Sequence, residues 1–214
     1  MKRLTEQQAV AQLQRVKTSY QSLIKKAYEP AALACKDCPS IGVCCTDAHF
    51  VNVHITRLEA VAIRGTLERT PRLTAEHRRA IYRRAAATVA QYNLRPTASD
   101  SFRQNFSCPL FEPGIGCVVH RRAKPSPCIQ HACYDNWEDV PPAELQWRTE
   151  HRVERLNNQV YGQSWTWLPI PLWLMLIDPE DQGRALKVYA AAWTTRRPPP
   201  SAQNHVRRSL PVIR

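Results

Sequence analysis

Eight cysteines in two groups of four are the residues of this sequence whose types and spacing most clearly point to chemistry. The first group lies within eleven residues and ends in an adjacent pair, and about sixty residues without a cysteine follow it. The groups are Cys35, Cys38, Cys44 and Cys45, then Cys108, Cys117, Cys128 and Cys133. Thiolates bind zinc and iron–sulfur centres, which commonly take four protein ligands each. The grouping therefore predicts that all eight cysteines are metal or cluster ligands.

Other uses of clustered cysteines fit this pattern less well. Cysteines that only fill a hydrophobic core would be scattered along the chain. The N-terminal residues lack the apolar run and cleavage site of a secretory signal, so we expect a cytoplasmic protein, and disulfides are rare in that compartment. Nucleophilic catalysis by Cys128 with His131 is a further alternative, but it would leave seven clustered cysteines unexplained.

The residues around the cysteines suit a metal centre. The Cys35–Cys38 spacing lets two sulfurs of one turn point at a common ion, whereas the adjacent Cys44 and Cys45 seldom both reach one. Eight thiolates are too many for one zinc ion, and match two four-ligand sites or one cluster with spare thiols. Nearby basic residues offset thiolate charge: Lys36, Arg121, Arg122 and Lys124. Four histidines are lesser ligand candidates: His49, His54, His120 and His131.

Helices must position these two groups. Apolar residues at three- and four-residue steps predict a helix over 5–29, and Thr56 with Glu59 forms a capping box at the start of another. Asp178 and Pro179 are typical of a further helix start. The helices predicted in this way span 5–29, 56–65, 74–94, 142–159 and 178–193.

The segments between the helices are rich in proline and glycine. "CPLF" and "GCVVH", joined by "EPGI", predict a short β-hairpin beside Cys108 and Cys117. The apolar stretch from Trp167 to Ile177 is too short to span a bilayer and is expected to be buried. All six tryptophans lie between residues 137 and 193, which predicts an apolar helical core there.

The fold class that follows is mainly α, a helical domain in which two irregular cysteine-rich loop segments assemble a metal centre. We expect one helical metal-binding domain over 1–195, with the cysteine-cluster core at about 31–135. Residues 196–214 are rich in arginine and proline and are expected to form a flexible basic tail.

The order of the cysteines and their neighbours resembles the YkgJ-type cysteine-cluster family, which is described as zinc- or iron-chelating. The resemblance covers about half of the chain, implies that all eight cysteines are ligands, and assigns Glu59 as the acid of the intervening helix. The matching stretches are Cys35-x-x-Cys38, Cys44-Cys45, "CPLF" from Cys108, "GCVVH" around Cys117, Cys128 and Cys133. The sequence departs from the family pattern at three places: Lys124-Pro125, His120 and His131-Ala132.

The cysteine domain of flagellin lysine N-methylase is similar and is associated with an iron–sulfur centre. This resemblance favours an iron–sulfur cluster, of the 4Fe–4S type, over zinc. Only six glycines occur in 214 residues, and none forms a glycine-rich methyl-donor loop. The methyl-transfer activity is therefore not implied.

The net charge of the chain indicates which kinds of partner to expect. The net charge of +12 favours an acidic protein or a nucleic acid, although no known nucleic-acid-binding motif is present. Two hypotheses result. The protein is a cytoplasmic iron–sulfur protein, with a redox or modifying activity that uses the centre, or it is a zinc-stabilised binding module for a protein or nucleic-acid partner.

Overall fold

The computed structural model describes residues 3–33, 37, 40–46, 52–95, 105–120, 122–162 and 167–194, without the side chains of 192–194. Helices account for 64% and strands for 7% of these residues, which confirms the mainly α fold class. Several predicted features lie outside the described residues: Cys35, Cys38, His49, Arg121 and the basic tail at 196–214.

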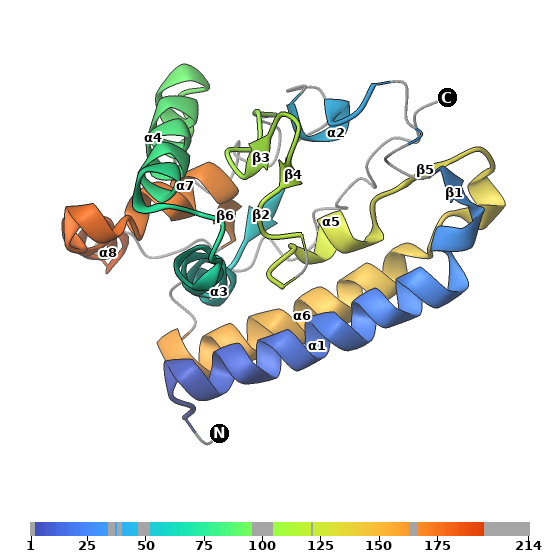
Figure 1. Ribbon diagram of the computed structural model, residues 1–214. Coiled ribbons are helices and arrows are strands. Elements are labelled where there is room, and N and C mark those ends of the chain that lie inside the picture. Colours follow the sequence, from blue (N-terminus) through green and yellow to red (C-terminus); the bar gives the residue numbers. More distant parts are fainter. Residues whose placement is uncertain are drawn as a thin grey trace.

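Two long helices, α1 (Glu6–Ala27) and α6 (Ala143–Tyr161), lie side by side and antiparallel along one side of the molecule (Figure 1). α1 begins at a capping box in which Thr5 and Gln8 exchange hydrogen bonds between side chain and backbone. The packed face of α1 carries Ala9, Leu13, Lys17, Tyr20 and Ile24. These residues recur at helical spacing, so the face is apolar except at Lys17.

The larger core lies on the other side, between α3 (Arg57–Arg69), α4 (Ala75–Gln91) and α7 (Ile170–Leu176). The apolar stretch from Trp167 supplies both α7 and the short strand β6 (Leu168–Pro169), and it is buried as predicted. Trp173 is fully buried, and its Nε1 donates a 2.8 Å hydrogen bond to the backbone oxygen of Ile55.

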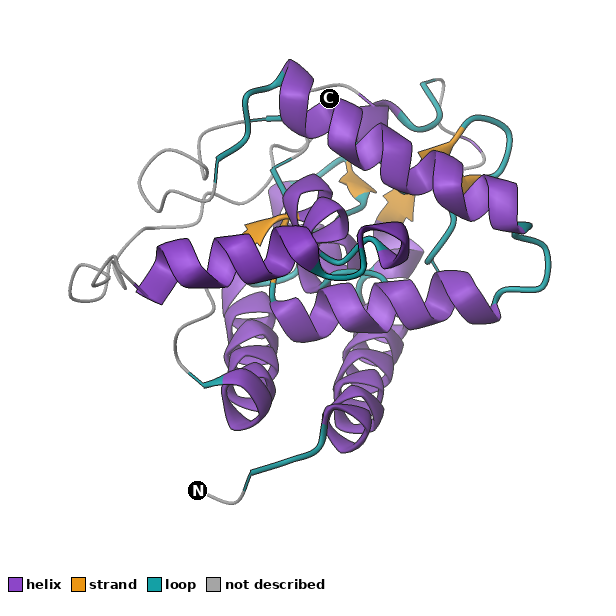
Figure 2. Cartoon of the chain, turned by 90° about the vertical axis from the view of Figure 1, so that its left-hand side faces the viewer, coloured by secondary structure: helices purple, strands orange, loops and turns teal. Residues whose placement is uncertain are grey.

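The described residues form three two-stranded antiparallel pairs, which Figure 2 shows lying between the helices. Two of these pairs connect segments that are distant in the sequence. β1 (Ala32–Leu33) pairs with β5 (Cys133–Tyr134), and β2 (His54–Ile55) pairs with β6. β3 (Phe111–Glu112) and β4 (Gly116–Cys117) form the predicted hairpin beside the cysteines. The described residues also form the α-helices α2 (Val43–Thr46), α5 (Ser126–Gln130) and α8 (Arg184–Thr194), and short 3₁₀ helices at Glu29–Ala31 and Trp137–Asp139.

Two predicted helix boundaries are wrong. α3 does not end near Gly65 but continues to Arg69, because one glycine costs a helix only about 1 kcal/mol and Leu67, beyond it, is fully buried. The helix predicted from Asp178 is interrupted. Asp178 caps a short 3₁₀ helix at Pro179–Asp181, and Gln182 and Gly183 then adopt positive φ angles of 52° and 74° before α8 begins.

The tryptophan prediction is only partly correct. Trp173 lies in the core, whereas Trp137 and Trp147 are 67% and 41% exposed. Across the described ranges, no helix combines the length and the apolar character needed to cross a membrane.

Candidate metal centre

The structure brings the two cysteine segments, 31–53 and 108–133, into contact. The backbone N–H of Cys108 donates a 2.7 Å hydrogen bond to the oxygen of Cys45, and the Ser107 hydroxyl donates one, also of 2.7 Å, to the oxygen of Thr46. Both acceptors lie on α2, next to the hairpin formed by β3 and β4 (Figure 1). Segments about sixty residues apart in the sequence therefore meet at the cysteines.

Gly42 makes this close approach sterically feasible. It has a positive φ of 85°, and a Cβ atom at this position would lie 2.1 Å from Cζ of Phe111. Any other residue would both strain the backbone and collide with the ring. The glycine thus allows the turn before α2 to rest on β3, which brings Cys44 and Cys45 toward Cys108.

Five thiols from both segments are close enough to influence one another electrostatically. Cys45 interacts with Cys44, Cys108 and Cys128. Cys108 interacts in turn with Cys117 and Cys128. The five thiols therefore form one connected group, which we call the thiol group: Cys44, Cys45, Cys108, Cys117 and Cys128.

Backbone amides are aimed at two of these sulfurs. The N–H groups of Leu110 and Phe111 act on the Cys108 thiol and lower its pKa, as that of Val119 does for Cys117, and the N–H of Phe111 also donates a 3.2 Å hydrogen bond to the backbone oxygen of Cys108. Each of these N–H groups lies two or three residues after its cysteine, so the tight turns of the hairpin direct the N–H groups toward the thiols. Hydrogen bonds of this kind favour the thiolate over the thiol.

Burial opposes the thiolate form at three positions. It raises the pKa of Cys108 and Cys117, and it raises the pKa of Cys128 to about 12, against the attraction of Lys124 and Lys17. A bound metal cation would reverse this balance, because it deprotonates a coordinating thiol.

Cys44 and Cys45 differ from the other members of the thiol group. Hydrogen bonds from Cys45 and His131 lower the pKa of Cys44 to about 4, and the same bond to Cys44 raises the pKa of Cys45. The two adjacent thiols therefore differ in acidity, with Cys44 the more acidic of the pair.

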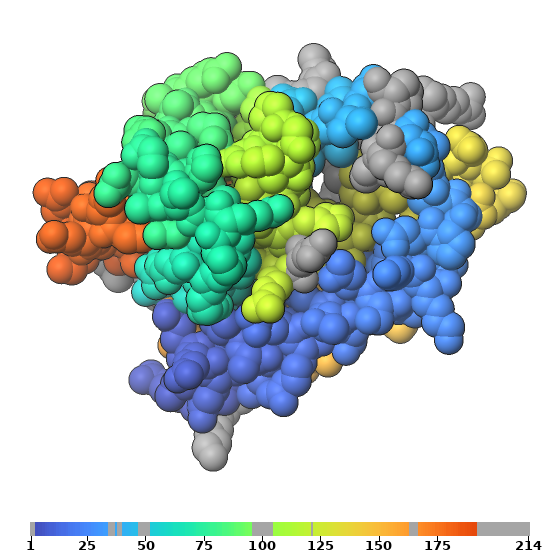
Figure 3. Space-filling model, in the orientation of Figure 1, coloured from blue at the N-terminus to red at the C-terminus, as the bar shows by residue number. Residues whose placement is uncertain are grey.

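Three of the thiols, those of Cys108, Cys117 and Cys128, pack against the larger hydrophobic core. The six described cysteines are half-buried and none of the six forms a disulfide. Figure 3 shows an opening in the surface beside α2 and the segment that carries β3 and β4. The cysteines of the thiol group therefore keep accessible surface although they lie among dense neighbours.

The short helix α5, which carries Cys128, is fixed to α1 by apolar and polar contacts. Ile129 packs against Tyr20 and Ile24. The Tyr20 hydroxyl donates a hydrogen bond to Gln130 on the same helix. The long helix α1 thereby holds the second cysteine segment in place.

Lys17 is a functional candidate that the sequence reasoning missed. Its Nζ lies 2.7 Å from Oε1 of Glu59 and donates a 3.0 Å hydrogen bond to the backbone oxygen of Lys124. Lys17 is only 5% exposed and Glu59 is fully buried. One signal in the sequence could have identified Lys17. It is a lysine on the otherwise apolar face of α1, four residues after Leu13 and three before Tyr20.

Glu59 has a structural use rather than a position among the thiols. It completes the predicted capping box, in which Oε2 accepts a 3.0 Å hydrogen bond from the N–H of Thr56. Its other oxygen forms the ion pair with Lys17. Glu59, which the family resemblance assigns as the acid of the intervening helix, is therefore linked to the second cysteine segment through Lys17.

The described histidine candidates lie in different surroundings. His131 contacts Cys44, and its Nε2 is buried without a hydrogen-bond partner among the described residues, so it is available to a bound group. His120 is exposed after β4, whereas His54 is buried in β2 opposite Pro169.

Cys133 lies on β5 and pairs with Leu33, two residues before Cys35.

No three or more His, Cys, Asp or Glu side chains within the described ranges are grouped closely enough to hold a metal ion. The chemistry of the donors nevertheless fits a metal that prefers sulfur, because soft thiolates with amide donors aimed at them suit zinc or iron–sulfur centres. Comparisons of the chain with family models, curated proteins and solved structures found no match.

Proposed function

We propose that the two cysteine segments hold a thiolate-bound metal centre, and that the centre is an iron–sulfur cluster. The observation that carries this proposal is the thiol group itself, in which five cysteines from distant segments interact and backbone amides lower the pKa of two of them. The residues that would hold the centre are the five members of the thiol group, with Cys133, Cys35 and Cys38.

The number of interacting thiols favours an iron–sulfur cluster over zinc. A structural zinc site takes four ligands, whereas five described thiols from the two segments already interact electrostatically. Hydrogen bonds to sulfur and burial are also the features by which proteins adjust cluster potentials. The family resemblance points in the same direction.

When bound, such a cluster supplies one-electron transfer. The chain's own residues would stabilise its negative charge: Lys17 and Lys124 lie near Cys128, and amides point at Cys108 and Cys117. The proposal includes a redox or modifying activity in the cytoplasm, since a reducing compartment keeps these thiols free.

A zinc-stabilised binding module is the second candidate. The elements around the cysteines are very short, with two-residue strands and helices of four and five residues. Segments of this size gain stability from a structural metal, because metal binding contributes folding free energy directly.

The metal content of matched variants tests the proposal. We expect Cys108→Ser to lose most of the metal bound by the wild type, measured by elemental analysis after anaerobic purification. Ser126→Ala is the control, because Ser126 is fully buried two residues from Cys128 but offers no thiol. Equal metal in the Cys108→Ser variant and the wild type would refute the assignment of this cysteine.

A further inference from the structure

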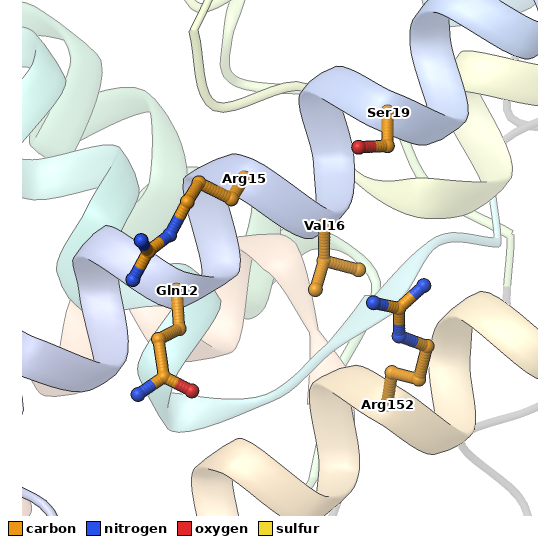
Figure 4. Close-up of a pocket in the computed structure, with 5 residues that line it drawn as sticks. All are labelled: Gln12, Arg15, Val16, Ser19 and Arg152. Carbon is orange, nitrogen blue, oxygen red and sulfur yellow. The ribbon is translucent and has the colours of Figure 1, made fainter.

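A groove runs between α1 and α6 and is lined by polar and basic side chains. Gln12, Arg15, Val16 and Ser19 of α1 form one wall, and Arg152 of α6 forms the other (Figure 4). The groove has a volume of about 290 Å³. Among the described residues, its lining contains no aromatic residue and no carboxylate.

Three arginines follow one exposed face of α6. Arg148, Arg152 and Arg155 are spaced by four and three residues, which places them on one stripe of a helix, about 6 and 4.5 Å apart along its axis. All three are exposed, as is Arg15 across the groove. We call these four residues the arginine stripe.

The charges of the arginine stripe are not compensated within the described part of the chain. None of the four arginines has an ion pair or hydrogen bond there. Carboxylates are available on α6, but Glu154 lies against His151 at 3.7 Å and Glu144 forms no ion pair with a described residue. On α4, by contrast, Arg79 and Arg83 both pair with Glu76.

We propose that the groove between α1 and α6 binds the phosphate backbone of a nucleic-acid strand. Guanidinium groups match phosphate oxygens with two parallel hydrogen bonds. A line of arginines about 10 Å long suits regularly repeated anions better than one small ion. The net charge of +12 favours the same class of ligand.

The composition of the groove indicates how the strand is recognised. Base recognition on single strands relies on aromatic stacking, and the lining residues that the structure describes are arginine, glutamine, serine and valine. The groove therefore contacts the backbone without reading sequence. This inference is independent of the metal centre, because none of the lining residues belongs to the thiol group.

The test measures the fluorescence anisotropy of a labelled single-stranded thymidine oligonucleotide of about 20 residues, at salt concentrations from about 50 to 200 mM. Arg148→Gln/Arg152→Gln is compared with Arg72→Gln/Arg83→Gln. The control removes two exposed arginines outside the arginine stripe. Metal content and thermal melting are recorded for each protein, so that a folding defect or metal loss is recognised.

We expect the stripe variant to bind about tenfold more weakly at low salt, and its plot of log affinity against log salt to be shallower by about 1.4, or 0.7 for each lost phosphate contact. The control should lose less than about twofold. Three results would overturn the proposal: no binding by the wild type, an equal loss in the control, or equally effective displacement by polyglutamate of the same charge, which would indicate an acidic protein partner.

Discussion

Among single residues, Lys17 has the greatest consequence for the cysteine segments. It joins α1 to Glu59 on α3 and to the backbone before α5, all within 3.0 Å. A buried ion pair is a weak source of net stability, because both charges lose their hydration. Its value lies in fixing where the second cysteine segment can sit and in placing a positive charge near Cys128.

Removal of the Lys17 charge should therefore be strongly destabilising. Lys17→Met leaves the fully buried Glu59 carboxylate without its counter-charge, and we expect the free energy of unfolding in urea to fall by about 3–5 kcal/mol. Lys17→Met/Glu59→Gln should recover most of this loss, since glutamine keeps the capping box. Lys25→Met, on the exposed face of the same helix, should change stability by less than about 0.5 kcal/mol. A single variant as stable as the wild type would show that the pair is unimportant.

Gly42 gives the second residue-scale prediction. Gly42→Ala should separate α2 from Phe111 and lower both the thermal stability and the bound metal. Gly114→Ala is a matched control, because Gly114 has a similar φ of 75° but open space around its Cβ position. The control should lose only the backbone strain of about 1 kcal/mol. Similar losses in both variants would argue against the contact with Phe111.

At the scale of elements, the long helices and the cysteine segments have different sources of stability. α1 and α4 bury apolar faces against other helices. In their described parts the cysteine segments contain only short strands and helices, which gain a few core contacts, such as those of Leu110 and Val119, and single hydrogen bonds such as that between Cys108 and Cys45. The segments should therefore depend on a bound metal, and the helices should not.

Hydrogen exchange tests this difference directly. After removal of metal by a chelator, amides in 40–46 and 108–133 should lose protection, because the metal's binding free energy is part of their folding free energy. Amides in α1 and α4 should keep theirs. Unchanged protection of the cysteine segments would mean that the protein fold alone holds them.

Element boundaries were predictable where a side chain defines them. Thr56 caps α3 as expected, and Thr74 caps α4 at the predicted start of the helix over 74–94, because both hydroxyls accept hydrogen bonds from N–H groups three residues on. The interruption at Gln182 and Gly183 was not predicted. A proline at the first position favours any helix start equally, so it could not distinguish one long helix from a 3₁₀ turn followed by α8.

At the scale of the molecule, the cysteine pattern predicted which segments would come together but not what holds them there. Clustered thiols imply a common site, whereas the Lys17 ion pair, the amide groups aimed at Cys108 and the contact of Gly42 with Phe111 depend on long-range packing. Such packing has no local signature. The buried position of Lys17 shows this best, because its neighbours in space lie on other helices and loops.

The metal and sulfide content of anaerobically purified protein tests the central claim most directly. The account predicts a brown preparation with about four iron and four acid-labile sulfide ions per chain, as for a 4Fe–4S cluster, together with broad visible absorption that bleaches on reduction. Colourless protein with stoichiometric zinc would contradict the iron–sulfur assignment. Protein that binds neither metal would contradict the claim that the thiol group holds a metal centre.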